Sequence, residues 1–139
     1  MEYRRFADTY VVRMDRGEEI MTGLADLCEK ENIRLASVAA IGAVDHAVVG
    51  LYDVGEKVYH KKTFDEPMEI ASLLGTVTEK EGKPYLHLHA TLCDAHMQTH
   101  GGHVNELRIS ATCEMVLRLL PGAVGRRLDN VTGLNLFQF

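Results

Sequence analysis

The most regular pattern of hydrophobic and polar positions lies in the C-terminal third of the chain. From Leu107 to Leu119 every second residue is apolar, and polar residues such as Ser110 and Glu114 stand between them. A period of two places alternate side chains on opposite faces of a β-strand. The segment therefore predicts a half-buried strand, which Pro121 and Gly122 end.

A second pattern, in the N-terminal part of the chain, has the period of a helix. It opens on acidic residues, and negative charge stabilises the N-terminal end of a helix. The apolar positions are three or four residues apart and share one face: Ile20, Leu24, Leu27 and Cys28. We therefore predict a helix from about Glu18 to Glu31, ending near Asn32.

Most of the remaining chain is predicted as strands, because it is rich in β-branched and aromatic residues. The segments are Thr9–Met14, a long stretch from Ala36 to Tyr52 that bends at Gly42, Val58–Phe64, a hairpin over Ile70–Cys93, and Leu134–Phe139. Strand follows strand through short turns, without regular β-α alternation. We expect residues 1–139 to form a single compact α+β domain, a mostly antiparallel β-sheet with one main helix.

The composition is that of an ordinary globular domain in a reducing compartment. Hydrophobic residues make up 46% of the 139 residues, enough to bury a core without disulfides. The three cysteines, Cys28, Cys93 and Cys113, are odd in number and form no C-x-x-C pair. No stretch approaches the roughly 20 apolar residues of a membrane span. We expect a cytoplasmic protein without a membrane partner.

Charge argues against a nucleic-acid partner. Asp and Glu total 20 against 15 Lys and Arg, which gives a net charge of −5. Phosphate neutralisation needs clustered cations. The strongest basic cluster is Arg126 and Arg127, which is too small for a DNA footprint.

The histidines carry the candidate chemistry, since five of the seven fall between His87 and His103. Within the predicted strand Pro84–Cys93, His87 and His89 point to the face opposite the leucines. They lie roughly 6–7 Å apart along the strand. That separation allows two imidazoles to converge on one metal ion at about 2.0–2.1 Å from each nitrogen.

His103 is the candidate third ligand, because it follows Gly101 and Gly102, which permit a sharply turned loop. Three histidines would leave one coordination position for water or substrate, as in catalytic zinc sites. We therefore predict a divalent metal, zinc, at His87, His89 and His103. The alternative is that an H-x-H pair is simply two polar residues on an exposed strand face.

Other polar residues have weaker claims on such a site. Glu69, Glu106 and Glu114 are candidates for proton transfer or for outer contacts to the imidazoles. Cys93 shares the histidine face, either as a soft ligand or as a small buried residue. We expect His96 and His100 to be exposed to solvent in a polar loop. His46 and His60 have no partner in the sequence and are expected to be ordinary surface or hydrogen-bonded residues.

Five segments, in order and spacing, resemble the plant-and-prokaryote-conserved (PPC) domain over nearly the whole chain: Ile41–Val44, Glu69–Gly75, Pro84–His89, Gly101–His103 and Thr112–Val116. The resemblance implies an α+β domain on an antiparallel sheet, assembled as a homotrimer. More distantly, the chain resembles the fold of acetolactate decarboxylase, a zinc enzyme with histidine ligands. The family's H-x-H falls on His87 and His89 and its G-G-H on His103, although Val104 stands where leucine is usual.

Three functions follow from the residues and the resemblance. The first is a stand-alone, homotrimeric PPC protein that binds a divalent metal. The second is DNA binding, the role usually ascribed to prokaryotic members, although the Arg-Gly-Arg-Pro core of the plant AT-hook is absent here. The third is a metal-dependent enzyme, a hydrolase or decarboxylase acting on a small molecule, with Glu69 or Glu114 near the metal. A cupin-type metal barrel fits less well, because Cys93 and Asp94 stand where its carboxylate is usual.

Overall fold

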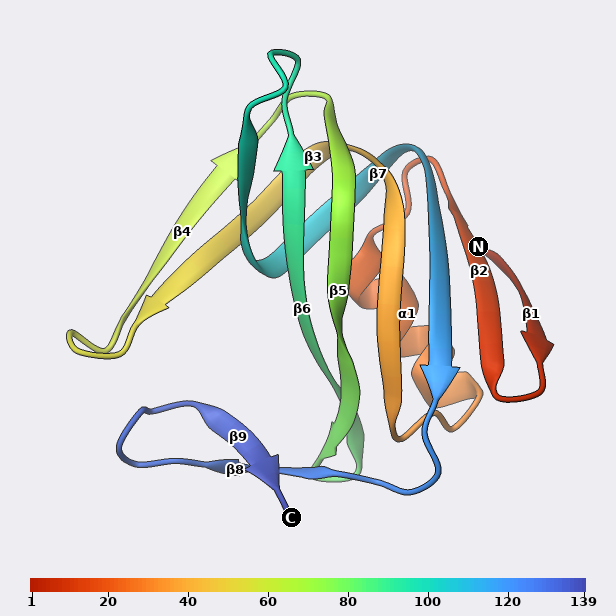
Figure 1. Cartoon of the computed structure of the whole chain (residues 1–139), viewed down its shortest axis with the longest axis vertical. Helices are drawn as coiled ribbons and strands as arrows, with labels where there is room; N and C mark the ends of the chain where they lie inside the picture. The colour runs from red at the N-terminus through yellow and green to blue at the C-terminus, as the bar shows by residue number, and fades with distance from the viewer.

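Two long, bent strands organise the fold in the computed structural model, which describes residues 1–139. Strand β3 (Ala36–Asp53) pairs with β7 (Thr99–Leu119) along most of its length. Three register shifts interrupt the pair, and such bulges bend the strands that carry them. Each long strand therefore takes part in two regions of the sheet, one near each of its ends (Figure 1).

The other strands complete one sheet of nine, in which all pairs except β5 with β8 are antiparallel. Strands β5, β6, β7 and β3 each pair with the next, and β3 pairs back with β5, so these four close on one another. The predicted α+β domain with a mostly antiparallel sheet is thus confirmed. The remaining strands are β1 (Glu2–Phe6), β2 (Thr9–Asp15), β4 (Val58–Phe64), β5 (Met68–Lys80), β6 (Lys83–Cys93), β8 (Gly125–Leu128) and β9 (Asn135–Gln138).

The single helix, α1 (Ile20–Lys30), buries the face that the sequence predicts. It begins two residues later than expected because Glu19 is the N-cap, with its carboxylate accepting from the backbone N–H groups of Met21 and Thr22 at 2.9 and 2.7 Å. The four buried helix residues are Ile20, Leu24, Leu27 and Cys28. They join the buried side of β2, β3, β5, β6 and β7 in one core.

The opposite side of this sheet has no helix over it (Figure 1). Four large apolar side chains on it are 44–58% exposed: Val11, Ile41, Leu74 and Val116. Strand register places Val11 opposite Val116, and Val116 opposite Ala39, which faces Leu74. We call this set of four residues the outer apolar face. These side chains depart from the rule that apolar side chains of a strand face the core, and such exposed patches often mark contact surfaces.

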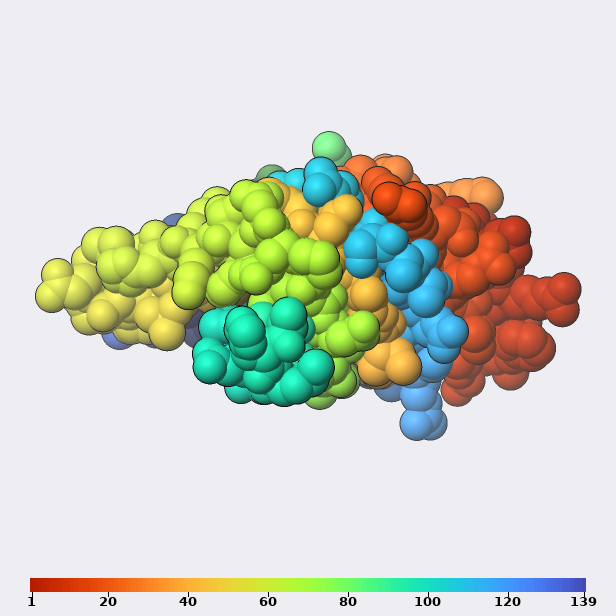
Figure 2. Space-filling view, turned by 90° about the horizontal axis from the view of Figure 1, so that it is seen from above, coloured from red at the N-terminus to blue at the C-terminus, as the bar shows by residue number.

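Two projections extend from the sheet (Figure 1). One is the arm formed by β4 and the second half of β3, which reaches out to one side (Figures 1 and 2). The other is the C-terminal hairpin of β8 and β9, attached to β5 by a single parallel bridge between Glu79 and Gly125. The arm and the hairpin meet where the Lys57 ammonium donates to the carbonyl of Asn130 at 3.5 Å.

The structure differs from the sequence prediction at both ends of the chain. Strand β1 was not predicted, because four of its five residues are exposed and show no alternation. Strand β8 was also missed, whereas β9 lies within the predicted segment Leu134–Phe139. Strand β7 starts at Thr99 rather than Leu107, and Ala111, expected in the core, is exposed beside a register shift.

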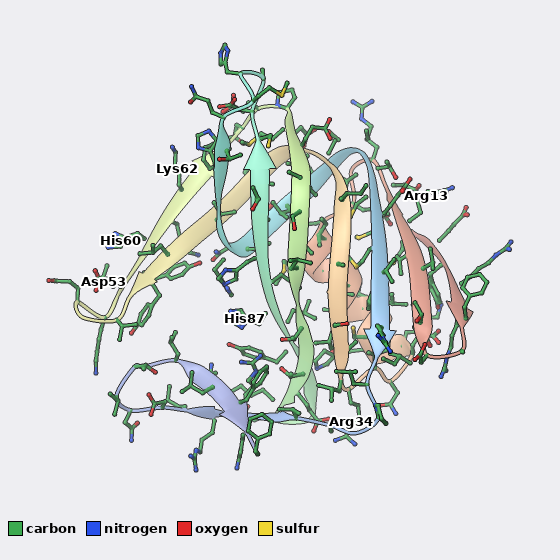
Figure 3. All side chains as sticks on the ribbon, in the orientation of Figure 1. Arg13, Arg34, Asp53, His60, Lys62 and His87 are labelled. Carbon is green, nitrogen blue, oxygen red and sulfur yellow. The ribbon has the colours of Figure 1, made fainter.

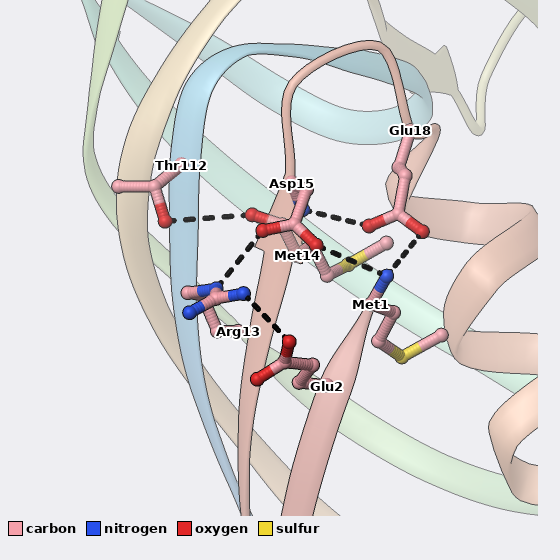
Figure 4. Close-up of polar contacts among 7 residues, drawn as sticks. All are labelled: Met1, Glu2, Arg13, Met14, Asp15, Glu18 and Thr112. Carbon is pink, nitrogen blue, oxygen red and sulfur yellow. Dashed lines mark hydrogen bonds and ion pairs between the residues drawn. The ribbon is translucent and has the colours of Figure 1, made fainter.

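Polar contacts tie the first residues to the helix (Figure 4). The N-terminal amine donates to the carboxylates of Glu18 at 2.6 Å and Asp15 at 3.3 Å. Arg13 then joins Asp15 to Glu2 on the neighbouring strand at 2.9 and 3.2 Å. These contacts hold β1 and β2 at the start of α1. The structure contains no helix long and apolar enough to cross a membrane.

Candidate metal centre

The three predicted histidines come from two adjacent strands. His87 and His89 alternate with buried Leu88 and Ala90 on β6, so both point away from the core. His103 lies on β7 directly opposite His89. Figure 3 shows His87 projecting from β6 into the region between the arm and the C-terminal hairpin.

The imidazole rings converge. Ring centroids are 5.1 Å apart for His87 and His89, 5.2 Å for His87 and His103, and 5.5 Å for His89 and His103. One nitrogen from each ring lies within 4.8 Å of the other two. Nitrogens on a tetrahedral zinc ion are about 3.3 Å apart at normal Zn–N distances. Small side-chain rotations therefore suffice, and the donor set fits a divalent metal that prefers imidazole.

The two glycines before His103 act differently from the sequence prediction. Gly101 and Gly102 lie inside β7, paired with Thr91 and Ala90, and do not form a loop. A Cβ at Gly101 would overlap the carbonyl oxygen of Ala90. One at Gly102, where φ is +156°, would lie 2.6 Å from the carbonyl oxygen of Gly50 on β3. Glycine is required because β7 passes this close to both neighbours, which fixes the position of His103.

Electrostatics favour the neutral imidazole form of His87 and His103. Withdrawal of the ring from water lowers the pKa of His87, and the charges of His89 and Arg126 lower it further. The pKa of His103 is lowered by burial and then by its two histidine neighbours. Neutral imidazole is the form that binds a metal, because its nitrogen lone pair is free.

Tyr59 and Asn105 support His103 from the arm and from β7. The Asn105 amide donates to the Tyr59 hydroxyl at 2.6 Å and to the carbonyl of His103 at 3.2 Å. The Tyr59 ring meets the His103 ring edge-on, with centroids 6.2 Å apart. Since the Tyr59 oxygen accepts from Asn105, its own hydrogen remains free to donate to a molecule at the site. Sequence gives no signal for this pair, because register alone brings them together.

The predicted carboxylates lie away from the triad within one chain. Glu69 is opposite Cys93, which is about 13 Å along β6 from His89. Glu114 is opposite Ile41 on β3 and opposite Arg13 on β2, at the other end of β7. The cluster of ligating atoms contains neither residue. That Glu69 and Glu114 transfer protons or hydrogen-bond to the histidine rings stays a prediction.

The remaining histidines separate into paired and exposed residues. His100, expected to be exposed in a loop, lies in β7, where its Nε2 is 3.0 Å from the Asp94 carboxylate and its ring is 4.9 Å from that of Phe64. His46 has a partner that sequence did not reveal, since its ring contacts the Asp65 carboxylate. His96 and His60 are exposed.

The cysteines do not contribute ligands to the cluster. Cys28 and Cys113 are buried and free, and burial raises the pKa of their thiols to about 12 and about 11. Such thiols stay protonated near neutral pH. Cys93 is free and half-buried at the far end of β6 from His87.

The fold and site together define an antiparallel α+β domain with three convergent histidines on adjacent strands. The sequence matches the Plants and Prokaryotes Conserved (PCC) domain over residues 1–121. The chain therefore belongs to this family, the PPC family that its motifs resemble. None of the curated proteins compared with the chain matches it.

Solved structures extend this result to the whole chain. A candidate DNA-binding protein from Bacteroides thetaiotaomicron is 28% identical, with a TM-score of 0.97 over 99% of this chain and 96% of its own. A metal-containing protein from Archaeoglobus fulgidus is 36% identical, with a TM-score of 0.88 over 99% of this chain and 97% of its own. Acetolactate decarboxylase from Bacillus subtilis is 14% identical, with a TM-score of 0.59 over 86% of this chain and 55% of its own, which shows a shared fold alone.

Proposed function

We propose that this PPC protein is a homotrimer that binds one divalent metal ion, zinc, per chain through His87, His89 and His103. The observation that carries the proposal is the placement of three ligating nitrogens within 4.8 Å of one another. The metal-containing relative from Archaeoglobus fulgidus, 36% identical, supports it. Three neutral nitrogen donors suit zinc and leave one coordination position for another molecule.

A zinc ion at this site would act as a Lewis acid and lower the pKa of a bound water. The chain's own residues would hold and orient whatever occupies the open position. His103 is fixed by the close packing of β7 on β6 and β3, and the Tyr59 hydroxyl is free to donate a hydrogen bond. A small-molecule ligand at the metal is therefore part of the proposal. A hydrolase or decarboxylase reaction of this ligand would also need a group that transfers a proton. Glu69 and Glu114 are the candidates for that role.

The outer apolar face supports the trimer. Its four side chains lie on the side of the sheet that α1 does not cover, and a second copy of the chain would remove them from water. Residues from neighbouring strands form a largely apolar groove there, whose lining includes Ala39, Ile41, Leu74 and Val116 together with the polar residues Ser72 and Glu114. Burial of such a face between like subunits is the usual basis of a stable homo-oligomer.

DNA binding is the second candidate function, because the relative from Bacteroides thetaiotaomicron is described as a candidate DNA-binding protein. The net charge of −5 opposes it, and a trimer would carry three times that charge. Arg126, half of the strongest basic cluster, is only partly exposed, and contacts within the chain hold it beside the histidines, so it adds little to a DNA-binding surface. A tight, salt-sensitive gel shift with the purified protein would support DNA binding.

The free cysteines and the absence of any disulfide suit a reducing compartment, so we place the protein in the cytoplasm.

Metal analysis of purified protein tests the proposal. The wild type is compared with a His87→Ala/His89→Ala/His103→Ala variant and with a His60→Ala control, in which an exposed histidine on the arm is removed. We expect about one zinc per chain in the wild type and the control, and almost none in the triple variant. Equal zinc contents in all three proteins would refute the proposed site.

A further inference from the structure

Arg126 is a strongly basic side chain beside the histidine triad, close enough for its charge to act on His87. It lies on β8 of the C-terminal hairpin, beyond the residues that the family match covers. Its Nη2 reaches the Thr76 hydroxyl at 3.5 Å, and Thr76 is directly opposite His87 across β5 and β6. Side chains of such cross-strand pairs are neighbours on one face of the sheet. The guanidinium and the His87 ring therefore share one side of the site.

Contacts within the chain fix the position of the guanidinium. Nε donates to the Thr78 hydroxyl at 2.9 Å, and Nη1 donates to the carbonyl of Asn135 at 3.1 Å. The guanidinium carbon also lies over two aromatic rings, 4.8 Å from the centroid of Tyr85 and 4.2 Å from that of Phe137. A side chain held in this way loses little further freedom when it binds a ligand.

No carboxylate neutralises this charge. Other arginines of the chain, Arg13, Arg34 and Arg108, each form an ion pair with an Asp or Glu side chain. The partners of Arg126 are hydroxyl groups, one carbonyl and aromatic rings. A guanidinium has five N–H groups, so two remain without a protein acceptor after these three bonds.

A divalent cation on the three neutral imidazoles would add a second positive charge beside Arg126. Two cations close together repel each other, and an anion bound between them is attracted to both. Guanidinium groups bind carboxylates and phosphates through two parallel hydrogen bonds. Phosphate sites commonly include the N-terminus of a helix. This site has none, because the single helix lies on the other side of the sheet, so a carboxylate fits it better than a phosphate.

We propose that Arg126 and the metal together bind a small organic carboxylate, whose carboxylate group accepts hydrogen bonds from the guanidinium and occupies the open metal position. This inference rests on the proposed metal site and adds the chemical class of its ligand. Tyr59, whose hydroxyl hydrogen is free, faces the same site from the arm.

Titration of the cobalt-substituted protein with sodium acetate tests this inference at constant ionic strength, because the visible spectrum of tetrahedral cobalt responds to its fourth ligand. We expect Arg126→Gln to raise the Kd for acetate about tenfold, the equivalent of about 1.4 kcal/mol. Arg127→Gln is the matched control, because it removes the same charge from the adjacent, exposed position and is expected to change the Kd less than twofold. Inorganic phosphate is titrated in parallel.

Equal acetate affinity in the wild type and Arg126→Gln, with cobalt still bound, would overturn the role of Arg126 and leave the metal site standing. Tighter, Arg126-dependent binding of phosphate would overturn the carboxylate class. Failure of the wild type to bind cobalt would overturn both proposals. If Arg126→Gln does not fold, Arg126→Lys retains the charge without the paired N–H groups, and unchanged acetate affinity in that variant would contradict the inference.

Discussion

His89 on β6 lies directly opposite His103 on β7, and their ring centroids are 5.5 Å apart. The two residues are separated by a hairpin whose loop is polar, and their pairing is possible because glycines precede His103. His87, two residues before His89 on the same face, brings the third ring to 5.1 Å from His89. The candidate site is therefore a consequence of strand register between β6 and β7.

Register makes the site sensitive to Gly101. We expect Gly101→Ala to lower the free energy of unfolding by about 1–3 kcal/mol, because a Cβ there would overlap the Ala90 carbonyl oxygen and push β7 from β6. Zinc affinity should fall as His103 moves away from His89. Chemical denaturation and zinc titration measure the two effects. Gly125→Ala is the control, because its Cβ would lie at an ordinary contact distance of 3.7 Å from its nearest neighbour. An equal loss of stability and zinc affinity in both variants would contradict the role of Gly101.

The pH dependence of the metal-free protein follows from the imidazoles. Both His87 and His103 have a folded-state pKa below the usual 6.5, so the unfolded chain takes up protons first as the pH falls. Their contribution to stability is present above about pH 6.5 and is lost as the pH falls through the folded-state pKa. We expect thermal unfolding between pH 7.5 and 5.5 to show a smaller pH dependence in His87→Gln/His103→Gln than in the wild type. Identical pH profiles would contradict the lowered pKa values.

A charged side chain introduced on the outer apolar face should disrupt the proposed trimer. We expect Leu74→Lys to convert a particle of about 46 kDa, three times the chain's 15.5 kDa, into monomers, because an ammonium group at an apolar interface must lose its water. Sedimentation equilibrium measures the mass. Val131→Lys changes a residue that is 79% exposed in the loop between β8 and β9, and its mass should equal that of the wild type. A trimer that survives Leu74→Lys would place the interface elsewhere.

The cysteines differ in their expected reactivity toward a thiol reagent. Cys28 and Cys113 are buried, with thiol pKa values of about 12 and about 11, so both should be inert in the folded protein at pH 8. Cys93 is the half-buried exception and should be labelled first. Mass spectrometry after brief labelling of the wild type and Cys93→Ser identifies the modified residue. Fast labelling of Cys28 in the folded protein would contradict its burial.

Sequence predicts those parts of the fold that alternation or helical spacing encodes. The buried face of α1 and the strand character of the segment from Leu107 to Leu119 are confirmed, because one side of each faces the core. Alternation was a poor guide at Ala111, where a register shift turns the side chain outward. It was also uninformative for β1, an edge strand with charged residues on both faces.

Convergence of the histidines was predicted from spacing, whereas the way in which it is achieved was not. Gly101 and Gly102 were expected to form a loop, but they lie in a strand where two neighbouring backbones approach. Arg126 stood out in the sequence only as part of a weak basic cluster. Its place beside His87 depends on a hairpin that crosses over to β5, and no local pattern encodes that contact.

The proposed zinc site can be tested with a crystal of the protein grown with zinc, using anomalous scattering data collected at the zinc edge. We expect one strong anomalous peak per chain, about 2.0–2.1 Å from a nitrogen of each of His87, His89 and His103. A zinc-loaded crystal with no peak at the three imidazoles, or with its peak at other residues, would contradict the proposed site.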